Sequence, residues 1–159
     1  MGLDMYLEAG KSINLGQPEY EAARQHISEL LGVSYDVLFE GESSEWRRIA
    51  VYTNIAYWRK ANAIHNWFVE NVQGGRDECQ RSYVSRNDLE EFESLCIRLL
   101  ETRDYDLAKE LLPVTSGFLF GYIDYDEFYW DNIEYTLDMI RKALHLEGLG
   151  FNIFYQSSW

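Results

Sequence analysis

Four short blocks of the sequence combine aromatic rings with side chains that hydrogen-bond or carry charge. They are residues 57–65, 83–86, 115–118 and 155–159. Aromatic rings stack on flat bases, while arginine, asparagine and serine side chains bind phosphates or base edges. The mixture is therefore typical of a site for a flat, polar, charged ligand. It is also what a well-packed protein with 16% aromatic residues contains.

Seven residues of these blocks are the candidate ligand contacts: Trp58, Arg59, Asn62, His65, Arg86, Ser116 and Trp159. We expect Arg59 and Arg86 to bind phosphate, because a guanidinium matches the geometry of a phosphate group. An aromatic ring would stack on the base. Two alternatives stay open: the arginines pair with neighbouring acids, and His65 is a hydrogen-bonded structural residue rather than a base.

The sequence carries no signature of a catalytic or metal centre. The stretch SGFLFG at residues 116–121 matches neither a phosphate-binding loop nor a nucleophile elbow. Asp126 and Glu127 stand near a predicted helix start, where carboxylates are usually capping residues. Cys79 and Cys96 lack CxxC spacing and a histidine cluster, which indicates two reduced thiols. We therefore expect no catalytic residue, no metal and no cofactor.

The charge of the chain is large, negative and unevenly distributed. The formal net charge is −13, which argues against binding to bulk nucleic acid, since phosphate backbones are held mainly by lysine and arginine. Residues 47–86, however, carry seven basic and three acidic residues, a net charge of +4 that leaves −17 for the rest of the chain. A basic middle of this kind favours a local anion pocket.

The spacing of apolar residues predicts an α+β fold, with several helices packed on a small mixed or antiparallel sheet, in a single domain of residues 1–159. Helix caps are predicted at Ser85 with Asp88 and at Asp124 with Glu127. No stretch has the roughly 20 apolar residues of a membrane helix, so we expect no membrane partner and a cytoplasmic location. The predicted strands are 3–7, 47–58 and 151–155, and the predicted helices are 18–32, 61–73, 85–100, 106–112 and 125–146.

Five segments together resemble small, mostly uncharacterised proteins encoded by bacteriophages. They are IAYWRKANAIHNWFVENVQGG, YVSRNDLE, ELLPVTSGFLFG, YDEFYWDNIEYT and the terminal YQSSW, with MGLDMYL at the start. The resemblance covers roughly residues 54–159 and the opening seven residues. It implies a phage origin and a host cytoplasmic location, and it implies no activity. Residues 8–53 fall outside it and are expected to form a variable region.

Three functions from different classes fit these observations. The first is a counter-defence protein that binds and sequesters a host nucleotide-type signalling molecule without chemistry. The second is an enzyme that degrades such a ligand, with His65 as general base and Arg59 and Arg86 stabilising developing charge. The third is an acidic inhibitor that binds a host defence protein. Homo-oligomerisation fits the first and the third.

Overall fold

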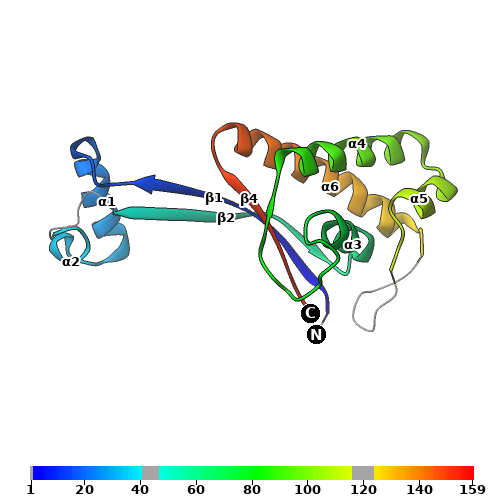
Figure 1. The fold of residues 1–159 in the computed structure, drawn as a ribbon, viewed down its shortest axis with the longest axis horizontal. Coiled ribbons are helices and arrows are strands. Elements are labelled where there is room, and N and C mark those ends of the chain that lie inside the picture. The colour runs from blue at the N-terminus through cyan, green and yellow to red at the C-terminus, as the bar shows by residue number, and fades with distance from the viewer. Residues whose placement is uncertain (1, 41–46, 116–123) are drawn as a thin grey trace. The chain divides into compact units, whose positions relative to one another are not determined.

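The computed structural model describes residues 2–40, 47–115 and 124–159 (Figure 1). The described residues combine helices with a four-stranded sheet, which confirms the α+β fold. The strands are β1 (Asp4–Asn14), β2 (Arg48–Arg59), β3 (Ser82–Val84) and β4 (Asn152–Ser158). The helices are the 3-10 turn η1 (Pro18–Tyr20), α1 (Glu21–Leu31), α2 (Tyr35–Phe39), α3 (Asn62–Asn71), α4 (Arg86–Thr102), α5 (Tyr105–Leu111) and α6 (Glu127–Gly148).

The described residues group into two compact units. Unit 1 consists of residues 1–10 and 52–159, and unit 2 consists of residues 11–51. The bounds of unit 2 agree to within three residues with those of segment 8–53. That segment lies outside the part of the sequence that resembles phage-encoded proteins. The separate compactness of this segment gives a structural basis for the expected variability, which itself stays a prediction.

The first and last strands of the chain are neighbours at the centre of the sheet. The strand order is β2-β1-β4-β3, and β4 runs antiparallel to both β1 and β3. Side chains alternate along the central strands, so that Met5 and Leu7 of β1 and Ile153 and Tyr155 of β4 are fully buried. These side chains form the sheet's contribution to the core.

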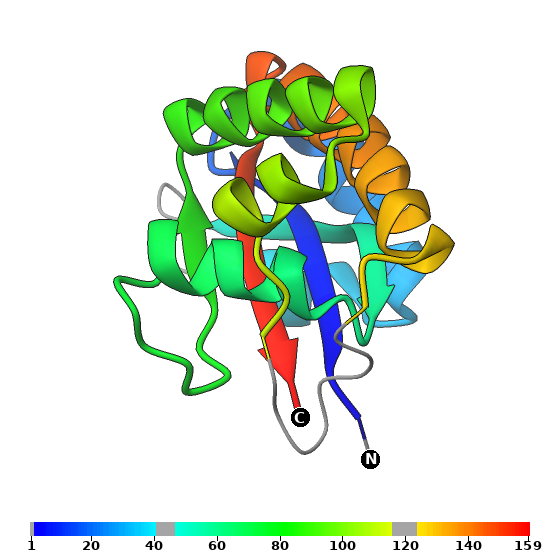
Figure 2. The ribbon, with the colours of Figure 1, turned by 90° about the vertical axis from the view of Figure 1, so that its right-hand side faces the viewer.

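Helices of unit 1 cover this buried face, with α3 lying across the strands and α4 packed along α6 (Figures 1 and 2). Aromatic rings fill the space between them. Phe68 of α3 stacks on Tyr155 of β4 with ring centroids 4.0 Å apart, and Trp67 stacks on Phe92 of α4 at 3.9 Å. Stacked rings add to the stabilisation from burial, so these contacts fix α3 and α4 to the sheet.

The capping patterns in the sequence predict one helix start correctly and miss another. Ser85 and Asp88 form the expected capping box at α4. At α6 the prediction of Asp124 is wrong, because Asp126 is the cap and its side chain accepts a hydrogen bond from the Tyr129 backbone N–H at 3.1 Å. The helix therefore begins at Glu127, two residues later than predicted.

The first and last strands, β1 and β4, are longer than their sequence patterns predict, while β2 has its predicted length. β1 continues beyond Leu7 to Asn14, and it passes Gly10, where the Tyr52 ring packs directly against the backbone. A methyl group at Gly10 would lie 2.4 Å from that ring. Only glycine allows so close an approach. The sequence also gave no indication of β3 and α2 as elements.

Three buried acidic groups of unit 1 should make the protein sensitive to alkaline pH. Burial raises the pKa of Cys96 from 9.0 to about 12, and it raises the pKa values of Tyr129 and Tyr155 above their ordinary value of 10. Below pH 9 both the folded and the unfolded chain keep these protons, so the contribution to stability is complete there. Above it the unfolded chain loses them first, and stability falls.

We expect these three groups to leave the free energy of unfolding unchanged between pH 7 and 9. It should then fall by up to about 1.4 kcal/mol per pH unit for each group that titrates only in the unfolded chain. Urea denaturation from pH 7 to 11 measures this, and a free energy that stayed level to pH 11 would contradict the burial of these groups.

Candidate functional site

An open depression lies where β2 ends and α6 begins. Arg59 and Lys60 line it from the end of β2, and Asp126 and Phe128 line it from the start of α6. Its volume is about 530 Å³, which is within the range of small-molecule sites. Among the described residues that the sequence predicted as contacts, Arg59 alone lines this depression.

Arg59 and Lys60 are adjacent cations at a sharp backbone turn between β2 and α3. Lys60 has a φ of 59°, in the left-handed region that costs a non-glycine residue about 1–2 kcal/mol. Its N–H donates to the carbonyl oxygen of Leu3 at 2.8 Å. This conformation lets the chain leave β2 and enter α3 within two residues. Strain of this kind is concentrated at functional sites.

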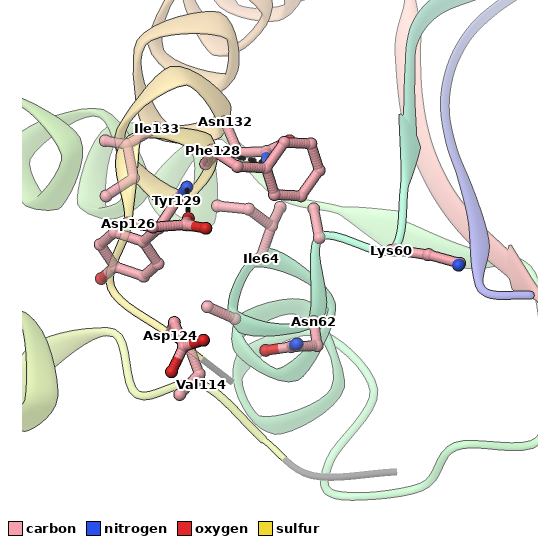
Figure 3. Close-up of a pocket in the computed structure, with 12 residues that line it drawn as sticks. Lys60, Asn62, Ile64, Val114, Asp124, Asp126, Phe128, Tyr129, Asn132 and Ile133 are labelled. Carbon is pink, nitrogen blue, oxygen red and sulfur yellow. Dashed lines mark hydrogen bonds between the residues drawn. The ribbon is translucent and has the colours of Figure 1, made fainter. Parts of the chain in front are cut away.

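The first turn of α6 presents an aromatic ring beside these cations. Phe128 is 49% exposed, which is unusual for a phenylalanine in a protein with a well-filled core. The Asn132 side chain donates to the Phe128 carbonyl oxygen at 2.6 Å, and Asp126 caps the helix two residues before Phe128 (Figure 3). These hydrogen bonds fix the helix start from which the Phe128 ring projects.

A narrow slot adjoins the depression and shares Lys60, Asp126 and Phe128 with it. The slot runs between α3 and α6, with Asn62 and Asp124 at one end (Figure 3), and its volume is about 20 Å³. That is room for about one water molecule. A base or a phosphate must therefore bind in the outer depression.

Asn62 lines the slot, and its polar groups hold a neighbouring segment. Its side-chain oxygen accepts a hydrogen bond from the Thr115 backbone N–H at 3.0 Å, and its carbonyl oxygen accepts one from the Thr115 hydroxyl at 3.3 Å. Asn62 is 3% exposed. These contacts give Asn62 a role in positioning the chain at residue 115.

His65 lies in a chain of hydrogen bonds that runs from the buried core to the exposed Trp159. Its Nδ1 is 2.7 Å from the Tyr155 hydroxyl, and its Nε2 is 3.0 Å from an oxygen of Asp77. The other oxygen of Asp77 accepts a hydrogen bond from the Trp159 indole at 3.1 Å. The structure thus brings together His65 and Trp159, through a carboxylate that the sequence analysis did not select.

One assignment of donors and acceptors satisfies this chain. The Tyr155 hydroxyl donates to Nδ1 of His65, and Nε2–H donates to the Asp77 carboxylate. Burial, together with the nearby Asp77 charge, raises the pKa of Tyr155 well above its ordinary value. His65 and Tyr155 are 2% and 0% exposed, so the arrangement supports the structural alternative for His65.

Trp58 and Arg86 are engaged in other contacts. Trp58 is buried, and its indole N–H donates to the Thr136 hydroxyl on α6 at 2.9 Å. Arg86 is ion-paired with Glu90 at 2.8 Å and with Glu147. The sequence analysis left open that the arginines pair with acids. This holds for Arg86, and Arg59 is also ion-paired, with Asp4 at 4.0 Å.

Arg59 and Arg86 lie at opposite ends of the sheet of unit 1. Arg59 is 4.0 Å from Asp4, which is paired with Ser158 at the end of β4. Arg86 follows β3, whose Val84 is paired with Ile153 near the start of β4. Five residues of strand separate the two positions by about 17 Å.

The described members of the predicted set therefore do not line one pocket, and Ser116 lies outside the described residues. The residues that join Arg59 instead are Lys60, Asp126 and Phe128. Two sequence features contain these residues. Lys60 belongs to a pair of cations before a helix, and Asp126 and Phe128 belong to the acidic aromatic run at residues 124–129. Nothing in the sequence indicated that these two places meet.

Searches against protein-family models, curated proteins and solved structures found no match to this chain. None of the described helices is long and apolar enough to cross a membrane. Within residues 2–40, 47–115 and 124–159, no group of three or more histidine, cysteine, aspartate or glutamate side chains could hold a metal ion.

Proposed function

We propose that the protein binds and sequesters a nucleotide-type ligand in the depression between β2 and α6, without changing it chemically. The observation that carries this proposal is the grouping of Arg59, Lys60 and an exposed Phe128 ring around one volume of about 530 Å³. Two cations, a ring and a carboxylate match the phosphate, the base and the sugar hydroxyls of a nucleotide.

The charges of the depression favour one direction of binding. The phosphate would bind at Arg59 and Lys60, because the Asp126 carboxylate repels it from the helix start. The base would stack on Phe128, and a ribose hydroxyl would donate to Asp126. The Lys60 side chain extends toward β1, away from the slot (Figure 3), which supports phosphate binding on the open side.

The side chains that line the depression support binding without chemistry. Its four described lining residues include no histidine, cysteine or hydroxyl group. His65, the base in the enzymatic alternative, is buried against Tyr155 and Asp77. The resemblance to phage proteins supplies the context: the ligand would be a host signalling nucleotide, bound in the host cytoplasm to block a defence response.

The test combines native mass spectrometry with four variants. The protein is mixed with a panel of cyclic oligonucleotides and adenine nucleotides, and any bound ligand is released by denaturation and identified by chromatography. We expect recovery of an intact ligand. Arg59→Gln and Phe128→Ala should each weaken binding at least about tenfold, the value of roughly 1.4 kcal/mol for one charged or stacking contact.

Lys60→Gly and Arg86→Gln refine this test. Glycine adopts the left-handed backbone freely, so Lys60→Gly should lose binding while the fold stays as stable or becomes more stable by up to about 1 kcal/mol. Arg86→Gln is the matched control, since Arg86 is exposed and distant, and it should bind normally. A cleaved ligand would establish the enzyme instead, and unchanged binding in the Arg59 and Phe128 variants would overturn the site.

A further inference from the structure

A second depression lies on the face of the unit 1 sheet that points away from the core, which we call the outer face. Helices α3, α4 and α6 lie on the other side, where Met5 and Tyr155 are buried (Figures 1 and 2). Side chains alternate along a strand, so their neighbours Tyr6 and Gln156 belong to the outer face. The depression has a volume of about 360 Å³ and is lined by Tyr6, Glu8, Asn54, Gln156, Ser157 and Ser158.

The charges at this depression are already balanced. Glu8 is the single charged side chain among the described lining residues, and its carboxylate accepts a hydrogen bond from Nε of Arg81 at 2.7 Å. The Arg81 guanidinium in turn lies 3.5 Å from the centroid of the Phe154 ring and 4.7 Å from that of the Tyr52 ring. An anionic ligand would be repelled by Glu8, so the depression suits a neutral ligand.

The lining offers hydrogen-bonding groups whose directions are fixed. The Gln156 amide donates from Nε2 to the Cys79 carbonyl oxygen at 3.1 Å, which leaves its oxygen as an acceptor. The ion pair with Arg81 orients the Glu8 carboxylate in the same way. The Asn54 amide and the Ser158 hydroxyl are exposed, and each can both donate and accept. This mixture matches a ligand with several hydroxyl groups, since a hydroxyl also donates and accepts.

Two tyrosine rings form the aromatic border of the depression. The rings of Tyr6 and Tyr57 have centroids 5.4 Å apart and an angle of 42° between their planes. Tyr57 is 46% exposed, and its hydroxyl donates to Asp4. Two rings at this angle cannot both stack on one flat base. The C–H groups of a puckered sugar ring project in several directions and can contact both rings.

We propose that the outer face binds a neutral pyranose sugar. The C–H groups of the sugar contact Tyr6 and Tyr57, and its hydroxyl groups form hydrogen bonds with Glu8, Asn54 and Gln156. Because the Glu8 and Gln156 side chains are already held by their partners, less conformational freedom is lost on binding. This site shares no lining residue with the depression between β2 and α6, so either proposal can fail without the other.

The test titrates the full chain with the methyl glycosides of glucose, galactose and mannose, and NMR spectra follow the backbone amide signals of Tyr6, Asn54 and Gln156. We expect at least one glycoside to shift these signals. Its uronate, which differs by a carboxylate at C6, should bind at least about fivefold more weakly because of the nearby Glu8 charge. Adenosine should bind more weakly than the glycoside, because its base is flat.

Each probe can contradict the proposal by itself. If none of the three glycosides shifted these signals, the saccharide site would be wrong. A uronate that bound as tightly as its glycoside would overturn the neutral class of ligand. Tighter binding of adenosine at the same signals would establish a site for a base in place of a sugar.

Asn54→Ala and Asn87→Ala form a matched pair of variants. Asn87 is exposed on α4 and does not line the depression, so Asn87→Ala should bind the glycoside as the wild type does. Asn54→Ala should lose at least about threefold in affinity, the value of one neutral hydrogen bond. Full affinity in Asn54→Ala, or an equal loss in both variants, would overturn the assignment.

Discussion

Replacing Phe68 with alanine should lower the free energy of unfolding by about 3–5 kcal/mol, the usual range for removing a buried phenylalanine. Phe68 is fully buried, and it links three elements of unit 1. Its ring stacks on Tyr155 of β4 with an angle of 8° between the planes, and it meets Phe92 of α4 edge-on at 5.4 Å. Alanine would leave a cavity where α3, α4 and the sheet meet.

Phe128→Ala is the matched control, since it makes the same substitution on a ring that is half exposed. We expect that variant to change stability by less than about 1 kcal/mol, while it loses the proposed ligand binding. Urea denaturation of both variants and the wild type provides the comparison. A loss below about 1 kcal/mol for Phe68→Ala would show that its stacked ring does not hold the core.

The second large effect concerns the hydrogen bond between His65 and Tyr155. His65→Leu should destabilise the protein by about 2–4 kcal/mol, because the Tyr155 hydroxyl is fully buried and would lose its partner at 2.7 Å. Asp77 would also lose the imidazole N–H. Tyr155→Phe alone removes only the hydroxyl and should cost about 1–2 kcal/mol.

The double variant makes this prediction specific to the hydrogen bond. When both partners become apolar, no buried polar group is left unpaired at that position. We therefore expect His65→Leu with Tyr155→Phe to cost at least about 1 kcal/mol less than the sum of the single substitutions. Urea denaturation of the four proteins measures the coupling. Additive losses would mean that the two side chains stabilise the fold separately.

Local patterns in the sequence predict most of the elements but not their arrangement. The helical spacing of Ile64, Trp67 and Phe68 predicts α3, and the serine and aspartate of the capping box predict the start of α4. These signals work because they depend on residues within one or two turns. Strand order depends instead on pairings such as Asp4 with Ser158, which are at opposite ends of the sequence. A local sequence pattern cannot predict such a pairing.

The candidate site was predictable only in part for the same reason. Arg59 is selected by its charge at the end of a β-rich run, and it does line the depression. Phe128 stands in the acidic aromatic run at residues 124–129, and only the packing of α6 shows that its ring is exposed. The role of Asp77 arises from contacts with His65 and Trp159, which are 12 and 82 positions away.

The close approach of Tyr52 to Gly10 has a consequence for how this chain can evolve. These two residues are the points where unit 2 leaves and rejoins unit 1, and they are in contact. Insertions are best tolerated where the entering and leaving chain are adjacent. The intervening segment can therefore be lengthened, shortened or exchanged by recombination while both neighbours keep their positions. One scaffold can in this way carry different grafted modules.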